Sequence, residues 1–89
     1  LNHNILKFMS DPVSLYQDAF VEAFELDDKN YLEYLKYQSI DEWDSIGHMT
    51  LISELENGFK ISIDTDDIVD FSSFKKGQEI LAKYKVKIN

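Results

Sequence analysis

Apolar residues recur at helical spacing soon after the first helix-start signal in the chain. Ser10 or Asp11 can accept a hydrogen bond from the first free backbone N–H groups, and Pro12 suits the first helical position. The residues that follow one face of a helix from there are Val13, Tyr16, Ala19, Phe20, Ala23 and Phe24. The pattern therefore predicts a helix over about residues 12–25.

A second helix is predicted over residues 45–57, with Gly58 as a left-handed C-terminal stop. Two stripes of residues run along it. The inward stripe is Leu51, Ile52, Leu55 and then Phe59, and the second stripe, rotated away from the first, is Ile46, Met49 and Ser53.

The stretch from Leu26 to Asp44 has no regular period and is predicted to be a long first loop. A short helical turn can open at Asn30, because Glu33 lies three residues later, as in a capping box. The loop is too apolar for a free linker. We expect five residues to pin it onto the core: Tyr31, Tyr34, Leu35, Tyr37 and Ile40.

The rest of the chain predicts a short helix and a final longer one. Residues 60–63 alternate like a strand but are too few, so they are read as an extended connection. A short acidic helix follows over 66–70, and Ser72 or Ser73 caps a last helix that runs to about Tyr84. Its inward residues are Phe74, Ile80, Leu81 and Tyr84.

These elements predict an all-α fold, a four-helix bundle with a short third helix and a long first loop. The 89 residues suit one domain, which we assign to residues 10–89, with residues 1–9 as an N-terminal extension. Only three Gly and one Pro interrupt the chain, which favours helices over a turn-rich β fold.

The chain contains no cysteine, which excludes disulfides and cysteine-based zinc sites and fits a reducing compartment. No run of about 18 apolar residues is present, so no membrane span is expected. The opening Leu1–Met9 is too short and too polar for a signal peptide. We therefore expect a cytoplasmic protein.

The net charge is −8, from 17 acidic and 9 basic residues, and it is unevenly spread. Residues 1–59 hold 12 acids and 3 bases. This balance argues against nucleic acid, whose phosphates need Lys and Arg. It favours partner enzymes with basic docking faces.

The motif Asp44-Ser45-Ile46 stands at the mouth of a helix after a long acidic loop. It resembles the Asp-Ser-Leu site of the acyl carrier protein family. The likeness extends over about Ser10 to Tyr84. It is carried downstream by Met49, Leu51, Ile52, Leu55, Glu56, Phe59 and Ile63, and by the step Phe71-Ser72-Ser73-Phe74.

The resemblance implies a carrier that is not itself an enzyme and that acts as a monomer. A phosphopantetheinyl transferase would attach 4′-phosphopantetheine from coenzyme A, with magnesium, to Ser45, and Asp44 would help position the site. Acyl groups would then be carried as thioesters to acyl-loading and acyl-transfer enzymes of a fatty-acid, polyketide or specialised pathway. Partner contacts are expected at Ile46, Met49, Glu54 and Glu56, with no metal bound.

Four features depart from the family pattern, two of them being Ile46 in place of Leu and Thr50 and Asn57 where fatty-acid carriers often have acids. Trp43 stands where many members have a small residue, so the loop before Ser45 is expected to pack differently. The segment Lys83-Tyr84-Lys85-Val86-Lys87 is basic where the family is often neutral or acidic. This favours a specialised stand-alone carrier, and we read its lysines as a solvated tail.

Other readings of the same residues stay open. An aminoacyl or peptidyl carrier would use the same arm, and an unmodified acidic interaction module would use Ser45 only as a helix cap. Ser45 and His48 could form a nucleophile–base pair, although no third group or oxyanion site is visible, and we expect His48 on the helix surface.

A calcium loop starting at Asp64 is excluded, because Val69 and Lys75 stand where an EF-hand needs Gly and Glu. The acids of this segment are read as a solvated helix start.

Overall fold

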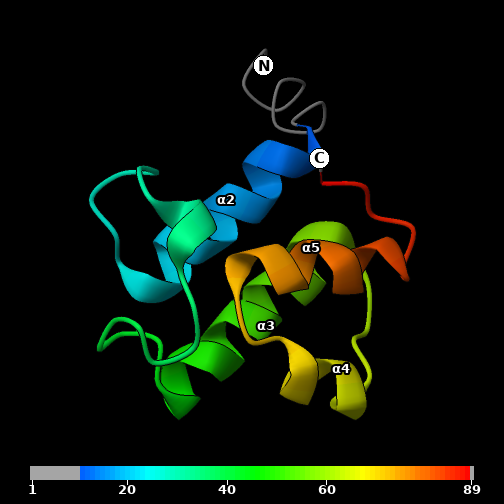
Figure 1. The fold of residues 1–89 in the computed structure, drawn as a ribbon. Coiled ribbons are helices and arrows are strands. Elements are labelled where there is room, and N and C mark those ends of the chain that lie inside the picture. The colour runs from blue at the N-terminus through cyan, green and yellow to red at the C-terminus, as the bar shows by residue number, and fades with distance from the viewer. Residues whose placement is uncertain (1–10, 89) are drawn as a thin grey trace.

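The computed structural model describes residues 11–88, which form an all-helical chain (Figure 1). The long helices are α2 (Pro12–Phe24), α3 (Ser45–Phe59) and α5 (Phe74–Ala82), and α4 (Thr65–Asp70) is short. A single 3-10 turn, η1 (Leu32–Tyr34), interrupts the first loop. Within these residues the only extended pairing is an isolated bridge between Lys36 and Ser73. The predicted four-helix bundle is confirmed, whereas the assignments for residues 1–10 lie outside the described residues.

The predicted helix starts are confirmed, and side-chain caps explain them. The Asp11 carboxylate accepts a hydrogen bond from the Ser14 backbone N–H at 2.7 Å. Asp44 does the same for Gly47 at the start of α3, at 2.8 Å. The Ser73 hydroxyl accepts from the backbone N–H three residues later, at 2.9 Å. Each cap satisfies one of the N–H groups that lack a partner within the helix.

The predicted stop at Gly58 is wrong. Helix α3 continues through Gly58 to Phe59, and Lys60 is the residue that adopts the left-handed conformation, with φ of 58°. The N–H groups of Lys60 and Ile61 both donate to the Glu56 carbonyl, which closes the helix end. A non-glycine residue therefore ends this helix, because these two hydrogen bonds stabilise the turn.

The final helix ends at Ala82, earlier than the predicted Tyr84. The chain then turns at Lys85, with φ of 68°, and runs back over the core. Val86 and Ile88 are buried, at 9% and 3% exposure. The segment therefore packs against the bundle through Val86 and Ile88 and is not a free tail, whereas its three lysines are exposed, as expected.

An aromatic cluster fills the space between the helices. Phe20 lies at its centre, with ring centroids 5.0 Å from Tyr16, 4.9 Å from Phe74 and 5.6 Å from Trp43. Trp43 is fully buried, so the large residue before the Asp44 cap belongs to the core. The loop before Ser45 is thus anchored to the core through this tryptophan.

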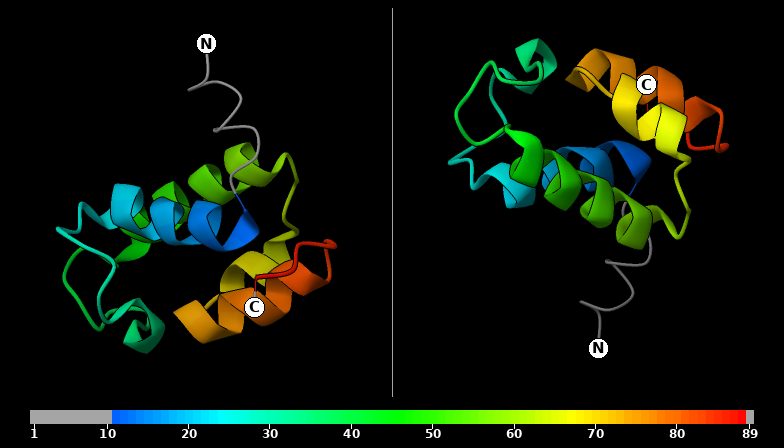
Figure 2. Two further views of the ribbon diagram at one scale, coloured as in Figure 1. Left: turned by 90° about the horizontal axis from the view of Figure 1, so that it is seen from above. Right: turned by 90° about the horizontal axis from the view of Figure 1, so that it is seen from below.

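Backbone hydrogen bonds tie the first loop to the start of α5. The Tyr37 N–H donates to the Ser72 carbonyl at 2.9 Å, and the Phe74 N–H donates to the Leu35 carbonyl at 3.0 Å. These bonds bring η1 beside the start of α5 (Figure 2). The expected anchors Leu35, Tyr37 and Ile40 do pack against the core.

The other two expected anchors do not reach the core. Tyr31 and Tyr34 are 76% and 65% exposed, and their rings lie against each other, with centroids 6.5 Å apart. The expected cap at Asn30 is also wrong, because Tyr31 precedes η1 in a left-handed conformation with no side-chain cap.

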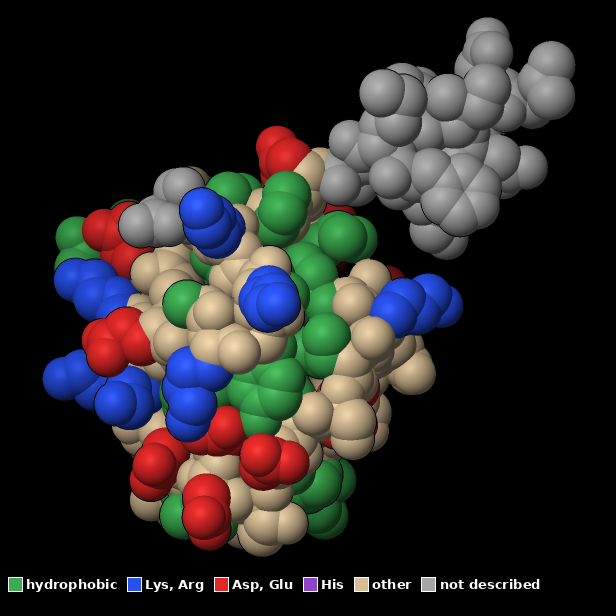
Figure 3. Space-filling view, turned by 90° about the vertical axis from the view of Figure 1, so that its right-hand side faces the viewer, with side chains coloured by type: hydrophobic (Ala, Val, Ile, Leu, Met, Phe, Trp, Pro, Cys, Tyr) green, Lys and Arg blue, Asp and Glu red, His purple; other side chains and the backbone are tan. Residues whose placement is uncertain are grey.

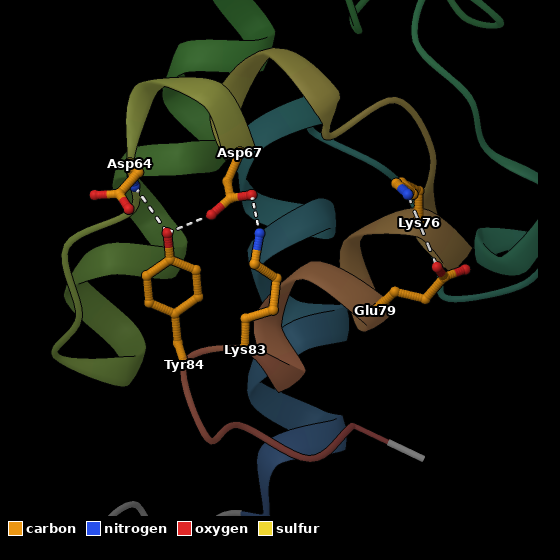
Figure 4. Close-up of polar contacts among 6 residues, drawn as sticks. All are labelled: Asp64, Asp67, Lys76, Glu79, Lys83 and Tyr84. Atoms are coloured by element: carbon orange, nitrogen blue, oxygen red, sulfur yellow. Dashed lines mark hydrogen bonds and ion pairs between the residues drawn. The ribbon is translucent and has the colours of Figure 1, made fainter.

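A polar cluster joins α4 to the end of α5 (Figure 4). The Asp67 side chain is only 8% exposed, and its carboxylate accepts hydrogen bonds from Lys83 and from the Tyr84 hydroxyl, both at 2.6 Å. The Tyr84 oxygen accepts in turn from the Asp64 N–H at 2.9 Å. The hydrogen bond from Lys83, followed by that from Tyr84, lowers the pKa of Asp67. The reading of Asp67 as a solvated acid is therefore wrong.

Positive and negative side chains lie close together on the face of the molecule that carries this polar cluster. Figure 3 shows blue lysine side chains close to red carboxylates on the face that lies to the right in Figure 1. Of the lysines in the basic C-terminal segment, Lys83 is paired with Asp67. This face is mixed in charge, unlike the acidic first loop.

Candidate functional site

Ser45 is the first residue of α3, and its side chain is exposed. The preceding Asp44 is the helix cap. Its carboxylate bonds the Gly47 N–H, and its carbonyl accepts from the His48 N–H at 2.8 Å. These two bonds fix the turn in which Ser45 stands. The serine hydroxyl therefore lies at the positive end of the α3 dipole, which favours an anion there.

The Ser45 hydroxyl has a side-chain partner that the sequence pattern did not reveal. Its Oγ lies 3.0 Å from the Tyr37 phenol oxygen, within hydrogen-bonding distance. Tyr37 comes from the first loop, eight residues before the serine, and was expected only to anchor that loop. The close approach depends on the backbone bond between Tyr37 and Ser72, which sequence periodicity does not report.

A cleft of about 390 Å³ opens beside Ser45, between α3, α4 and the first loop. Most of its lining is apolar, and Ser45 forms part of its wall. The residues that line it are Tyr37, Ser45, His48, Met49, Ile68, Val69, Phe71 and Ser72. The cleft can therefore receive an apolar group connected to the serine.

His48 is held between two neighbours and is not a free surface residue, so that expectation is wrong. The Trp43 indole N–H donates to His48 Nδ1 at 2.9 Å, and His48 Nε2 lies 2.8 Å from the Ile68 carbonyl oxygen. Because a carbonyl only accepts, Nε2 carries the proton and the ring is the neutral Nε2–H form. Both nitrogens are engaged, and neither serves Ser45 as a base.

Of the four residues expected to contact partner enzymes, three are exposed and one is hydrogen-bonded within the chain. Ile46 and Met49 are 79% and 50% exposed, beside the serine. Glu54 is exposed further along α3, whereas the Glu56 carboxylate accepts a hydrogen bond from the Ile63 N–H at 2.9 Å. Glu56 thus stabilises the connection after α3.

Val69 extends the exposed apolar surface across the cleft. It lies on α4 and is 75% exposed. Its exposure was not predicted, although an apolar residue in the acidic run Thr65–Asp70 was a usable signal. Met49 and Val69 line the cleft, and Ile46 is exposed directly after Ser45 in α3; these three apolar side chains are called the rim below.

Comparison with known proteins adds no relative. No family model matches the chain, and neither the curated proteins nor the solved structures yield a significant match. Among residues 11–88, no group of three or more His, Asp or Glu side chains is arranged to hold a metal ion. No helix in that range is long and apolar enough to cross a membrane. The function is therefore argued from this chain's own residues.

Proposed function

We propose that this chain is an acyl carrier protein that bears 4′-phosphopantetheine on Ser45. One observation carries the proposal: Ser45 is an exposed hydroxyl at the start of α3 and stands in the wall of a largely apolar cleft. The resemblance around Asp44-Ser45-Ile46 supplies the identity of the group. Such a site needs an accessible hydroxyl and room beside it, and Ser45 meets both needs.

In the attachment reaction the carrier supplies only the Ser45 hydroxyl and the turn that presents it. Ser45 Oγ forms a bond to the phosphorus next to the pantetheine in coenzyme A, and the P–O bond to the other phosphate breaks. Adenosine 3′,5′-bisphosphate leaves, and the hydroxyl proton passes to the transferase or solvent. Asp44 contributes by holding the turn that presents Ser45, and the α3 dipole stabilises the anion formed there.

The attached arm supplies a thiol that holds cargo as a thioester. The cleft lining suits an apolar cargo, which could be partly sheltered between α3 and α4. This favours acyl groups over charged aminoacyl groups, although an aminoacyl or peptidyl carrier would use the same arm.

Partner enzymes would dock on the rim formed by Ile46, Met49 and Val69. The exposed Glu54 and the acidic first loop would meet basic residues on those enzymes. We place this carrier in the cytoplasm, as a monomer with no catalytic activity of its own.

A second candidate rests on the same rim. Three exposed apolar side chains beside acidic segments also suit an interaction module that is never modified. In that function Asp44 and Ser45 only begin a helix, and the cleft receives a side chain of the partner.

Intact mass after incubation with coenzyme A, magnesium and a broad-specificity phosphopantetheinyl transferase separates the two candidates. We expect wild type to gain about 340 Da, the mass of one phosphopantetheine. Ser45→Ala should gain nothing, and Ser53→Ala, an exposed serine on the same helix, should gain as much as wild type. No gain in folded wild type with more than one transferase would favour the unmodified module.

A further inference from the structure

We propose that the Tyr37 phenol is the hydrogen-bond donor that holds the phosphodiester formed on Ser45. This inference rests on the proposed function. It assigns a positioning role to a residue of the first loop, eight positions before the serine.

Three separate contacts fix Tyr37 in place. Its backbone N–H donates to the Ser72 carbonyl at 2.9 Å. Its ring meets the His48 ring edge to face, with centroids 5.5 Å apart and an interplanar angle of 76°. Its hydroxyl lies 3.0 Å from Ser45 Oγ. The phenol is therefore preorganised over the serine and is not a mobile surface group.

His48, whose ring contacts the Tyr37 ring, is itself held in place by two hydrogen bonds. The imidazole bonds Trp43 on one side and the Ile68 carbonyl on the other. Trp43 is fully buried in the core. A continuous line of contacts therefore runs from the core through His48 to the Tyr37 ring.

Modification changes what this phenol can bond. Before modification, either the phenol or the serine hydroxyl can donate. Afterwards the serine oxygen is an ester oxygen with no proton, and two anionic oxygens lie one atom further on, bonded to the same phosphorus. A phenol that already reaches Oγ is within reach of them, and a hydrogen bond to an anion is stronger than one between neutral groups.

The acidic residues near Ser45 make a neutral hydrogen-bond donor such as the Tyr37 phenol important for the modified form. Asp41, Glu42 and Asp44 are exposed acids in the four residues before Ser45, so a new anion meets like charges. A neutral phenol offers a hydrogen bond without a positive charge. It would therefore stabilise the modified form while leaving the acidic docking surface unchanged.

The test compares the gain in stability on modification in wild type, Tyr37→Phe and Tyr34→Phe. Phe at position 37 keeps the ring contact with His48 and the backbone bond to Ser72, and it removes only a hydroxyl at the surface. Tyr34 is a matched control, because it is an exposed tyrosine of the same loop. Apo and modified forms of each are melted by heat, and the 31P resonance of each modified form is recorded.

We expect modification to raise the melting temperature of wild type and Tyr34→Phe by about 4–8 °C more than that of Tyr37→Phe. We also expect the 31P resonance of Tyr37→Phe to differ from the other two. A structural role alone would lower both forms of Tyr37→Phe equally and leave the gain on modification unchanged.

The outcomes keep this inference apart from the proposed function. If all three chains gain the mass of the arm but share one stability gain and one 31P resonance, the role of Tyr37 is wrong and the carrier function stands. If wild type gains no mass, both fail.

Discussion

The first turn of α3 approaches the preceding loop so closely that position 47 has no room for a side chain. A Cβ added at Gly47 would overlap the carbonyl oxygen of Glu42 and lie 3.3 Å from the Phe24 ring. The obstacle is backbone, which cannot rotate away. Gly58, in the same helix, has nothing within 4 Å of an added Cβ. The two glycines form a matched pair for Gly→Ala substitution.

The expected effects have opposite signs. Replacing a helical glycine by alanine stabilises by about 1 kcal/mol when there is space, and this is the expectation for Gly58→Ala. Gly47→Ala gains the same helix propensity, but forcing the loop away costs about 3 kcal/mol. The net result is a destabilisation of about 2 kcal/mol. The two variants should therefore differ by about 3 kcal/mol in the free energy of unfolding.

Urea unfolding followed by tryptophan fluorescence measures this difference. Trp43 is the single tryptophan of the chain, is fully buried, and lies four residues before Gly47, so its signal reports on this part of the core. A Gly47→Ala variant as stable as Gly58→Ala would refute the close approach. That result would also mean that the close approach of Gly47 to Glu42 does not fix the first loop against the turn that holds Ser45.

Three further predictions follow from the same contacts. His48→Ala should lower the free energy of unfolding by about 2 kcal/mol in urea titrations, because the buried indole N–H loses its acceptor; an unchanged midpoint would contradict that bond. Because the folded-state pKa of Asp67 lies below its unfolded value, its contribution to stability is present above the unfolded pKa and is lost as pH falls through the folded one. Asp67→Asn should therefore flatten the acid limb of a stability–pH profile, and an unaltered limb would disprove the pairing. Ile46→Arg or Met49→Arg should slow phosphopantetheine transfer several-fold with unchanged circular dichroism, since both are exposed beside Ser45; normal kinetics in both would mean that partners dock elsewhere.

The sequence was sufficient to predict the helices where local chemistry decides. Asp11 and Ser73 are short polar residues directly before apolar periodic runs, and each caps a helix as predicted. At α3 the cap is Asp44, one residue before the Ser45 that the sequence offered for this role. The end of α3 was mispredicted because glycine is only the commonest residue for a left-handed turn. At Lys60, hydrogen bonds to the Glu56 carbonyl stabilise the same conformation in a lysine.

The candidate site was predictable only in part. The position of Ser45 at a helix start and the exposure of Ile46 and Met49 follow from local pattern. The contact of Tyr37 with Ser45 depends on the path of the first loop, and the anchoring of His48 at Ile68 depends on how α3 and α4 meet in space. No periodicity reports such long-range contacts, which is why His48 was expected at the surface.

The burial of Asp67 has the same origin. Its partners, Lys83 and Tyr84, lie 16 and 17 residues further along the chain. From sequence alone, an acid in an acidic run is indistinguishable from a solvated one. Only the packing of the end of α5 beside α4 brings the two partners to it (Figure 4).

Fragment-ion mapping of the modified chain shows whether Ser45 is the residue that carries the arm. The protein is incubated with coenzyme A, magnesium and transferase, digested, and the residue that bears the added mass is located. We expect one adduct, on Ser45, with Ser39 and Ser53 unmodified. An adduct on another serine, or none on any residue of the folded chain, would contradict it.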